Sequence, residues 1–303
     1  MSPSRQHVLL YALLAVLSVA ALLPGQGVIT TVAGTPWTFR GDGGPAVNGP
    51  LGYVRGVAVD SAGNVYATDQ GNALVVSISV NGILEVVAGN GIGGYSGDGG
   101  PAVTAALAPL SVAVDSSRNI YIGESARVRR VSAAGIITTI AGTGTTGFSG
   151  DGGPATSAAL NGVFGVAVDG AGNLYLADQG NNRIRKISPG GTITTMAGSG
   201  GTGWGQGGFA GDGGPATSAR LNLPQGVAVD AVGNLYIADT GNNRMRKVDA
   251  TGKITTVAGT GGWGLSGDGG PAISATLDAP TGVAADAGGN VYVADYSCLL
   301  YTS

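Results

Sequence analysis

Most of the side chains here that could do chemistry are carboxylates. The 303 residues include eighteen acids but only one histidine, His7, and one cysteine, Cys298. One imidazole and one thiol are too few for a histidine-bound zinc site, and His7 lies in the expected N-terminal signal, so the mature chain would have no imidazole for zinc or for a serine-histidine pair. Carboxylates, in contrast, can bind calcium through their oxygen atoms. The roles to compare are therefore calcium binding, carboxylate catalysis and structural support.

Fifteen of the acids occupy three positions of a repeating unit, and only Glu85, Asp249 and Asp278 lie outside them. An acid that recurs in every unit is most simply a turn cap or a partner for a repeating arginine, because a unique active site would break the symmetry. We therefore predict structural roles and no catalytic residue, with calcium as a possible cofactor. The three groups are Asp60, Asp115, Asp169, Asp230 and Asp286; Asp69, Glu124, Asp178, Asp239 and Asp295; and Asp42, Asp98, Asp151, Asp212 and Asp268.

The elements that position these acids are short strands. The motif GDGGPA returns at intervals of 53 to 61 residues, which indicates a repeat architecture. Each unit reads as four strands, illustrated by VAVD at 166–169, NLYLAD at 173–178, RIRKI at 183–187 and ITTMAG at 193–198. A Gly-Asn connection between the first two predicts a hairpin with glycine in the left-handed turn position. Many of the 58 glycines are therefore expected to lie in turns, where their backbone conformations are needed.

Four antiparallel strands repeated around a ring predict an all-β fold, a β-propeller, because each small sheet can bury its faces only against its neighbours. A lone fourth strand at 29–34 precedes any first strand and would complete the last blade. The fifth unit stops after its second strand at Tyr296, so no third strand is expected there. About four and a half blades are therefore predicted for this sequence.

The units resemble NHL repeats at Gly165 to Asp169, at Asn173 to Asp178 and at Asn181-Asn182-Arg183. The resemblance extends over nearly all of residues 28–296. It implies propellers, most often six-bladed, that bind proteins, nucleic acid or glycans, with a few relatives that are lyases or hydrolases. Asn182 and Asn243 stand where the family places its histidine, and the missing histidines exclude the lyases that depend on histidine-bound zinc.

Charge argues against nucleic acid as a partner. The net charge is -3 and the pI is about 5.0, whereas binding to phosphates requires a basic face. Arginines and lysines recur in the third strands, and we expect them to pair with aspartates between blades. A stripe like that of RNA-binding relatives is the alternative.

Residues 1–27 lie outside the repeats and read as a signal peptide or an N-terminal anchor. Val8 to Leu23 are apolar and follow a short basic region, and membrane attachment is expected only through residues 8–23 if they stay uncleaved. The propeller is assigned to 28–297 and is expected to be secreted, periplasmic or on the cell surface. Residues 298–303 resemble a translated sequencing adapter, so the natural reading frame is expected to continue.

The long connections between units distinguish this chain from a minimal propeller. Each carries a short helical turn after its proline and a leucine nine residues past the GDGGPA aspartate, and all are expected to project from one face. Loops on a rigid scaffold commonly bind ligands. We therefore predict a binding module for a protein or carbohydrate, with loop-to-loop packing as the alternative role of these rings. The predicted ligand-binding residues are Trp37, Trp204, Trp263 and Phe209.

Two other functions remain open from the sequence. A calcium-dependent, lactonase-like hydrolase would place unlike acids and asparagines around the central channel. A structural repeat segment of a larger surface adhesin would need no ligand in this part of the chain.

Overall fold

The computed structural model describes residues 39–201, 205–286, 288–296 and 301–302, which belong to one compact unit, Thr38–Ser303. The expected N-terminal segment, the lone strand at 29–34, Trp37, Trp204 and Cys298 all lie outside the described residues. Helical structure in the described residues is confined to three-residue 3-10 helices. No helix among them is long and apolar enough to cross a membrane.

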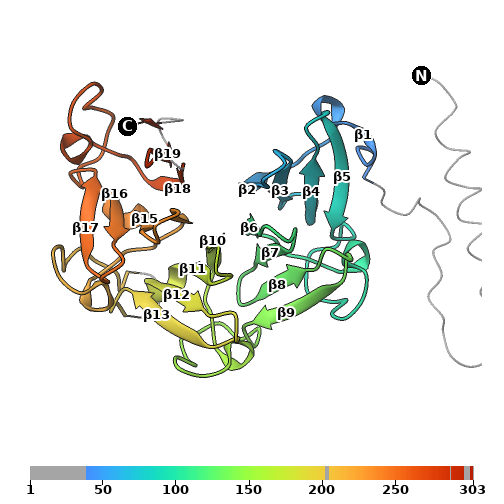
Figure 1. Ribbon diagram of the computed structural model, residues 1–303, viewed down its shortest axis with the longest axis horizontal. Coiled ribbons are helices and arrows are strands. Elements are labelled where there is room, and N and C mark those ends of the chain that lie inside the picture. The colour runs from blue at the N-terminus through green and yellow to red at the C-terminus, as the bar shows by residue number, and fades with distance from the viewer. Residues whose placement is uncertain (1–38, 202–204, 287, 297–300, 303) are drawn as a thin grey trace, which may run out of the picture. The chain divides into compact units, whose positions relative to one another are not determined.

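The described chain forms five antiparallel sheets, each of which is named here as a blade in chain order (Figure 1). Blades 2, 3 and 4 have four strands each, joined in sequence order. Blade 1 comprises β2 (Val54–Val59), β3 (Val65–Asp69), β4 (Leu74–Ile78), β5 (Ile83–Ala88) and the short β1 (Gly44–Pro45); blade 2 comprises β6 (Ser111–Val114), β7 (Ile120–Gly123), β8 (Val128–Val131) and β9 (Ile137–Ala141); blade 3 comprises β10 (Val163–Val168), β11 (Leu174–Asp178), β12 (Arg183–Ile187) and β13 (Ile193–Ala197); blade 4 comprises β14 (Val227–Val229), β15 (Leu235–Asp239), β16 (Arg244–Val248) and β17 (Ile254–Ala258); blade 5 comprises β18 (Pro280–Ala285), β19 (Val291–Asp295) and β20 (Tyr301–Thr302).

The blades follow one another around a common centre, with the first strand of each blade innermost and, in blades 2, 3 and 4, the fourth strand outermost (Figure 1). The first strand of every blade contacts the first strand of the next, from β2 through β6, β10 and β14 to β18. Valine and alanine side chains of these five strands line one shared central space. The predicted β-propeller is therefore confirmed.

Each interface between neighbouring blades is a hydrophobic core to which both sheets contribute side chains. Between blades 2 and 3, Tyr121 packs in one cluster with Leu176 and Leu160, and the two leucines are fully buried. Burial of such side chains is the main favourable contribution to folding, at about 1.5–3 kcal/mol each. A blade with one bare face would lose this contribution, so neighbouring repeats depend on each other for stability.

A glycine sets how closely the innermost strands approach. At Gly165 of β10, an added Cβ would lie 2.3 Å from the backbone oxygen of Gln225 in the next unit. At Gly226 of blade 4, a Cβ would lie 2.7 Å from the oxygen of Thr281. The glycine of the GVAVD motif thus allows adjacent first strands to come together at the centre.

The GDGGPA segments of the long connections lie along the outer strands. Gly152 donates its backbone N–H to the oxygen of Ile193 in β13 at 2.8 Å, and Ile193 donates back to Gly153 at 3.0 Å. These bonds cover the outer edge of blade 3, which would otherwise expose unpaired backbone groups. The short helices of these connections are η1 (Ala46–Asn48), η2 (Ala102–Thr104), η3 (Ala155–Ser157), η5 (Ala216–Ser218) and η7 (Ala272–Ser274), while η4 (Gln179–Asn181) and η6 (Thr240–Asn242) join the second and third strands.

Blade 5 has a third strand that the sequence pattern does not predict. β20 pairs with β19 through Tyr292 opposite Thr302 and Val293 opposite Tyr301. The free edge of β19 offers backbone donors and acceptors to any extended segment, whatever its sequence. Pairing at this edge needs no repeat motif, so the repeat pattern of the sequence does not predict β20.

Candidate functional site

The hairpin aspartates cap the turn between the first two strands of each blade. In blade 3, Asp169 Oδ1 accepts backbone N–H groups of Ala171 and Asn173 at 3.0 and 2.8 Å, and Oδ2 accepts Asn173 Nδ2 and the Tyr175 hydroxyl at 2.8 and 3.1 Å. Burial alone would raise the pKa of Asp169, but these hydrogen bonds outweigh it and lower the pKa below its usual value. Both oxygens are therefore engaged in holding the turn. Asp60, Asp115, Asp230 and Asp286 accept the same bonds from the equivalent asparagine and tyrosine.

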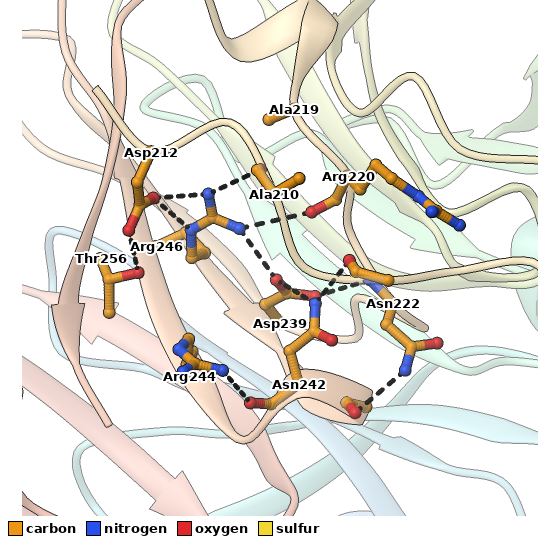
Figure 2. A network of polar contacts seen from close by, with 12 residues as sticks. Ala210, Asp212, Ala219, Arg220, Asn222, Asp239, Asn242, Arg244, Arg246 and Thr256 are labelled. Carbon is orange, nitrogen blue, oxygen red and sulfur yellow. Dashed lines mark hydrogen bonds and ion pairs between the residues drawn. The ribbon is translucent and has the colours of Figure 1, made fainter. Parts of the chain in front are cut away.

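The other two repeating acids hold a buried arginine, as Figure 2 shows for blade 4. Arg246 is fully buried, and its Nη2 lies 2.6 Å from Asp212 while its Nη1 lies 3.2 Å from Asp239. Thr256 donates its hydroxyl to Asp212 at 2.6 Å, and Asn242 donates its side-chain amide to Asp239 at 2.8 Å. All five residues come from one unit. The expected pairing between blades is therefore wrong here, because the connection that carries Asp212 lies on the outer strand of its own blade.

Blades 1 and 2 depart from this network. Val76 occupies the register position of Arg246 in blade 1, so buried Asp69 has no ion pair with an arginine among the residues that the structure describes. In blade 2, Arg129 keeps its ion pair with Asp98 at 2.6 Å, but its Nε and Nη1 have no hydrogen-bond partner among the described residues. Glu124 replaces the inner aspartate, and burial raises the pKa of Glu124.

Phe209 packs between two arginines of its own blade. Its ring centroid lies 3.9 Å from the guanidinium carbon of Arg244 and 4.8 Å from that of Arg246. Phe148 and Tyr95 make the same contacts with arginine pairs in blades 3 and 2. This repeated stacking gives Phe209 a structural role, although 43% of the residue stays exposed.

Trp263 is 84% exposed and lines a cavity of about 520 Å³ near the centre of the propeller. Of the four predicted ligand-binding rings, only Trp263 and Phe209 fall within the described residues. The cavity brings Trp263 together with residues of blades 1, 3, 4 and 5, but Phe209 is not part of its lining.

The cavity belongs to a central opening where the blades present unlike residues. The position just before the glycine or serine in each first strand is Arg55, Leu110, Phe164, Gln225 or Thr281. Four of these, all except Leu110, line an adjoining cavity of about 460 Å³, which Tyr53 and Tyr296 also line. Pockets for small ligands commonly span about 300–1,000 Å³. We define the mouth as Arg55, Phe164, Gln225, Thr281 and Tyr296.

Arg55 and Phe164 connect two blades within the mouth. The Arg55 guanidinium carbon lies 4.3 Å from the centroid of the Phe164 ring, and Arg55 Nη1 donates to Gln70 Oε1 at 3.4 Å. Both side chains are half-buried. The prediction based on tryptophans does not include these residues. A usable signal is present in the sequence, because their position differs in every unit while the flanking residues repeat.

The sequence also allows calcium binding by the repeating acids. Within the described ranges, no group of three or more histidine, cysteine, aspartate or glutamate side chains lies close enough to hold a metal ion. Calcium binding therefore stays a prediction.

Comparisons with known proteins point to one kind of repeat. Residues 205–266 match the Teneurin NHL domain family. Teneurin-4 from Homo sapiens is 30% identical over 239 residues, which cover 69% of this chain and 8% of the relative. NHL repeat-containing protein 3 from Mus musculus is 34% identical over 85 residues, covering 27% of this chain and 20% of the relative. This chain therefore spans a small part of the relatives that it matches.

Among solved structures, one chain of the nidogen/laminin complex superposes with a TM-score of 0.55 and 19% identity, covering 82% of this chain and 74% of that chain. A gluconolactonase from Xanthomonas campestris superposes with a TM-score of 0.53 and 14% identity, covering 81% and 70%. At these identities the similarity concerns the fold. The sequence matches to the Teneurin NHL domain and to NHL proteins show that the chain belongs to the NHL-repeat family of β-propellers.

Proposed function

We propose that this propeller is an extracytoplasmic binding module that takes a protein or carbohydrate ligand at the mouth, without catalysis. The observation that carries the proposal is the contrast between repeated and unrepeated positions. The hairpin aspartates are engaged in turn caps, and five further repeated acids, Asp98, Asp151, Asp178, Asp212 and Asp239, are engaged in ion pairs. The mouth, in contrast, gathers unlike residues from four blades around one cavity. A ligand that lacks the symmetry of the repeat needs such an asymmetric site.

The chemical character of the mouth supports binding. It combines the aromatic rings of Phe164 and Tyr296, the amide of Gln225, the hydroxyl of Thr281 and the cation of Arg55. Ligand pockets typically pair apolar surface with a few polar groups that fix orientation. Trp263 extends the apolar surface in the adjoining cavity, with which the mouth shares Arg55, Phe164, Gln225 and Tyr296.

The location outside the cytoplasm rests on the apolar segment before the repeats. The proposed absence of catalysis rests on the hairpin aspartates, since an acid such as Asp169 with both oxygens in hydrogen bonds is poorly placed to accept a substrate proton.

A glycan array and an array of extracellular protein domains, both probed with the purified whole chain, would test the proposal. Gln225→Trp fills the mouth, and Val232→Trp makes the same addition on a hairpin where Val232 is 75% exposed. We expect every specific signal to fall with Gln225→Trp and to persist with Val232→Trp. Signals that survive Gln225→Trp unchanged would place the ligand elsewhere and contradict the proposal.

A further inference from the structure

Arg55 is the one charged residue among the five equivalent positions at the centre of the propeller. Leu110, Phe164, Gln225 and Thr281 occupy that position in the other blades. A cation that only one repeat carries is not needed for the fold of a blade, because four blades form without it. Its presence in the mouth therefore bears on what the mouth binds, and the inference below rests on the function proposed above.

Arg55 forms no ion pair within the described part of the chain, although the carboxylate residue Asp278 lines the 520 Å³ cavity that Arg55 also lines. The buried arginines Arg129, Arg185 and Arg246 each lie within 2.7 Å of an aspartate oxygen. Arg55 has no such ion pair, and its described contacts are the ring of Phe164 and the side-chain oxygen of Gln70. A guanidinium carries five N–H donors, so one hydrogen bond leaves most of them for a ligand.

Arg55 is also held in position before any ligand arrives. Stacking on Phe164 at 4.3 Å and the bond to Gln70 restrict a side chain that would otherwise lose much rotamer freedom on binding. Half-burial strengthens its attraction for an anion relative to a fully solvated arginine. Planar carboxylates match this fork of donors with two parallel hydrogen bonds.

The remaining mouth residues fit a ligand with many hydroxyl groups and an apolar ring face. Gln225 and Thr281 supply neutral donors and acceptors, and they lie in the same cavity as Arg55. Tyr53 and Tyr296 are 59% and 74% exposed and line that cavity too. Flat aromatic surfaces with a polar tip suit the C–H face of a sugar ring beside its hydroxyls.

We propose that the mouth binds an acidic sugar, a uronic acid residue whose carboxylate forms hydrogen bonds with Arg55 and whose ring packs against the exposed tyrosines. The cavity of about 460 Å³ lies within the range of small-ligand pockets. Arg55 would thereby select acidic over neutral glycans.

Calorimetric titration of the whole chain tests this inference with D-glucuronate and D-galacturonate against D-glucose and D-galactose. We expect each uronate to bind about tenfold or more tightly than its neutral counterpart at low salt, with the difference shrinking as salt is raised. Arg55→Gln should remove the preference, and Arg55→Lys should retain part of it because it keeps the charge. Arg130→Gln is the control, since it removes an exposed cation outside the mouth.

Several results would overturn the inference. Equal binding of uronates and neutral sugars, no uronate binding at all, or an undiminished preference in Arg55→Gln would each do so. N-acetyl-L-glutamate binding more tightly than the uronates would assign the mouth to acidic peptides instead. If ligands found on the arrays still bind and remain sensitive to Gln225→Trp in these cases, the proposed function stands although the acidic-sugar inference fails.

Discussion

The guanidinium of Arg55 in blade 1 lies 4.3 Å from the ring centroid of Phe164 in blade 3, so two strands more than a hundred residues apart in sequence meet at the centre of the propeller. The two residues occupy the same position of the repeat and have opposite chemical character. Their contact is possible only because the innermost strands converge. The centre of the fold is thus where the repeats stop being equivalent.

Removing the inner carboxylate of blade 4 should destabilise the protein strongly. Asp239→Asn keeps the shape of the side chain but deprives Arg246 of its fully buried carboxylate, so that only Asp212, whose side chain is 35% exposed, still pairs with it. We expect a loss of about 3–5 kcal/mol in the free energy of unfolding, measured by urea denaturation.

The matched control for that change is Asp69→Asn in blade 1, where Val76 stands in place of the arginine. Asp69 is as buried as Asp239, but its hydrogen bonds within the described residues are to neutral groups of Gly52 and Asn72. A loss of about 1–2 kcal/mol is expected. Equal losses in the two variants would show that the buried arginine does not set the cost.

The hairpin caps should make stability depend on acid pH. The pKa of Asp169 is lowered in the folded protein, so its contribution is fully present above the unfolded pKa of about 4 and is lost as pH falls through the folded pKa. The difference in unfolding free energy between wild type and Asp169→Asn should thus be about 1 kcal/mol or more at pH 7 and shrink below about pH 4. Glu85→Gln, the same change on an exposed side chain of β5, serves as control. A difference that grows on acidification would refute the assigned direction.

Phe209 should matter for stability and not for ligand binding. Phe209→Leu removes the stacking on Arg244 and Arg246 while keeping an apolar side chain, as Leu265 does naturally in the corresponding position of the next unit. A cost of about 0.5–2 kcal/mol is expected in chemical denaturation. If Phe209→Leu lowers ligand affinity but leaves stability unchanged, Phe209 belongs to the binding site, as the sequence predicts.

Trp263 should show the opposite behaviour. It is 84% exposed beside the mouth, so Trp263→Ala should change the unfolding free energy by no more than about 0.5 kcal/mol. Ligand affinity should fall about fivefold or more, as expected for a contact worth 1 kcal/mol. Leu265→Ala is the control, because Leu265 lies in the same connection but does not line the cavity. Similar affinity losses in both variants would indicate a general effect on the loop.

The sequence predicts the blades well because each depends on local chemistry. The VAVD strand, the Gly-Asn turn and the Asn-x-Tyr strand lie within one hairpin, and the cap of Asp169 involves residues no more than six positions away. Repetition at a fixed interval then implies that the sheets pack on one another, since a lone sheet cannot bury both faces.

Features that depend on register between distant segments are harder to predict. The GDGGPA connections pair with outer strands through backbone groups such as those of Gly152 and Ile193. Backbone hydrogen bonds of this kind cannot be inferred from the pattern of side chains. The aromatic residue that precedes the GDGG aspartate in four of the five units looks available in sequence, yet in blade 4 it packs against Arg244 and Arg246. The mouth can be recognised from the sequence only if the repeats are aligned. The alignment then shows that the position of Arg55 holds a different residue in every unit.

The most direct test of the account is the dissociation constant of one array-identified ligand for wild type, Gln225→Trp and Val232→Trp, measured by calorimetry on folded samples. Binding at the mouth predicts that Gln225→Trp weakens affinity about tenfold or more, while Val232→Trp stays within about twofold of wild type. Wild-type affinity in Gln225→Trp would contradict the claim that the ligand binds where the five repeats differ.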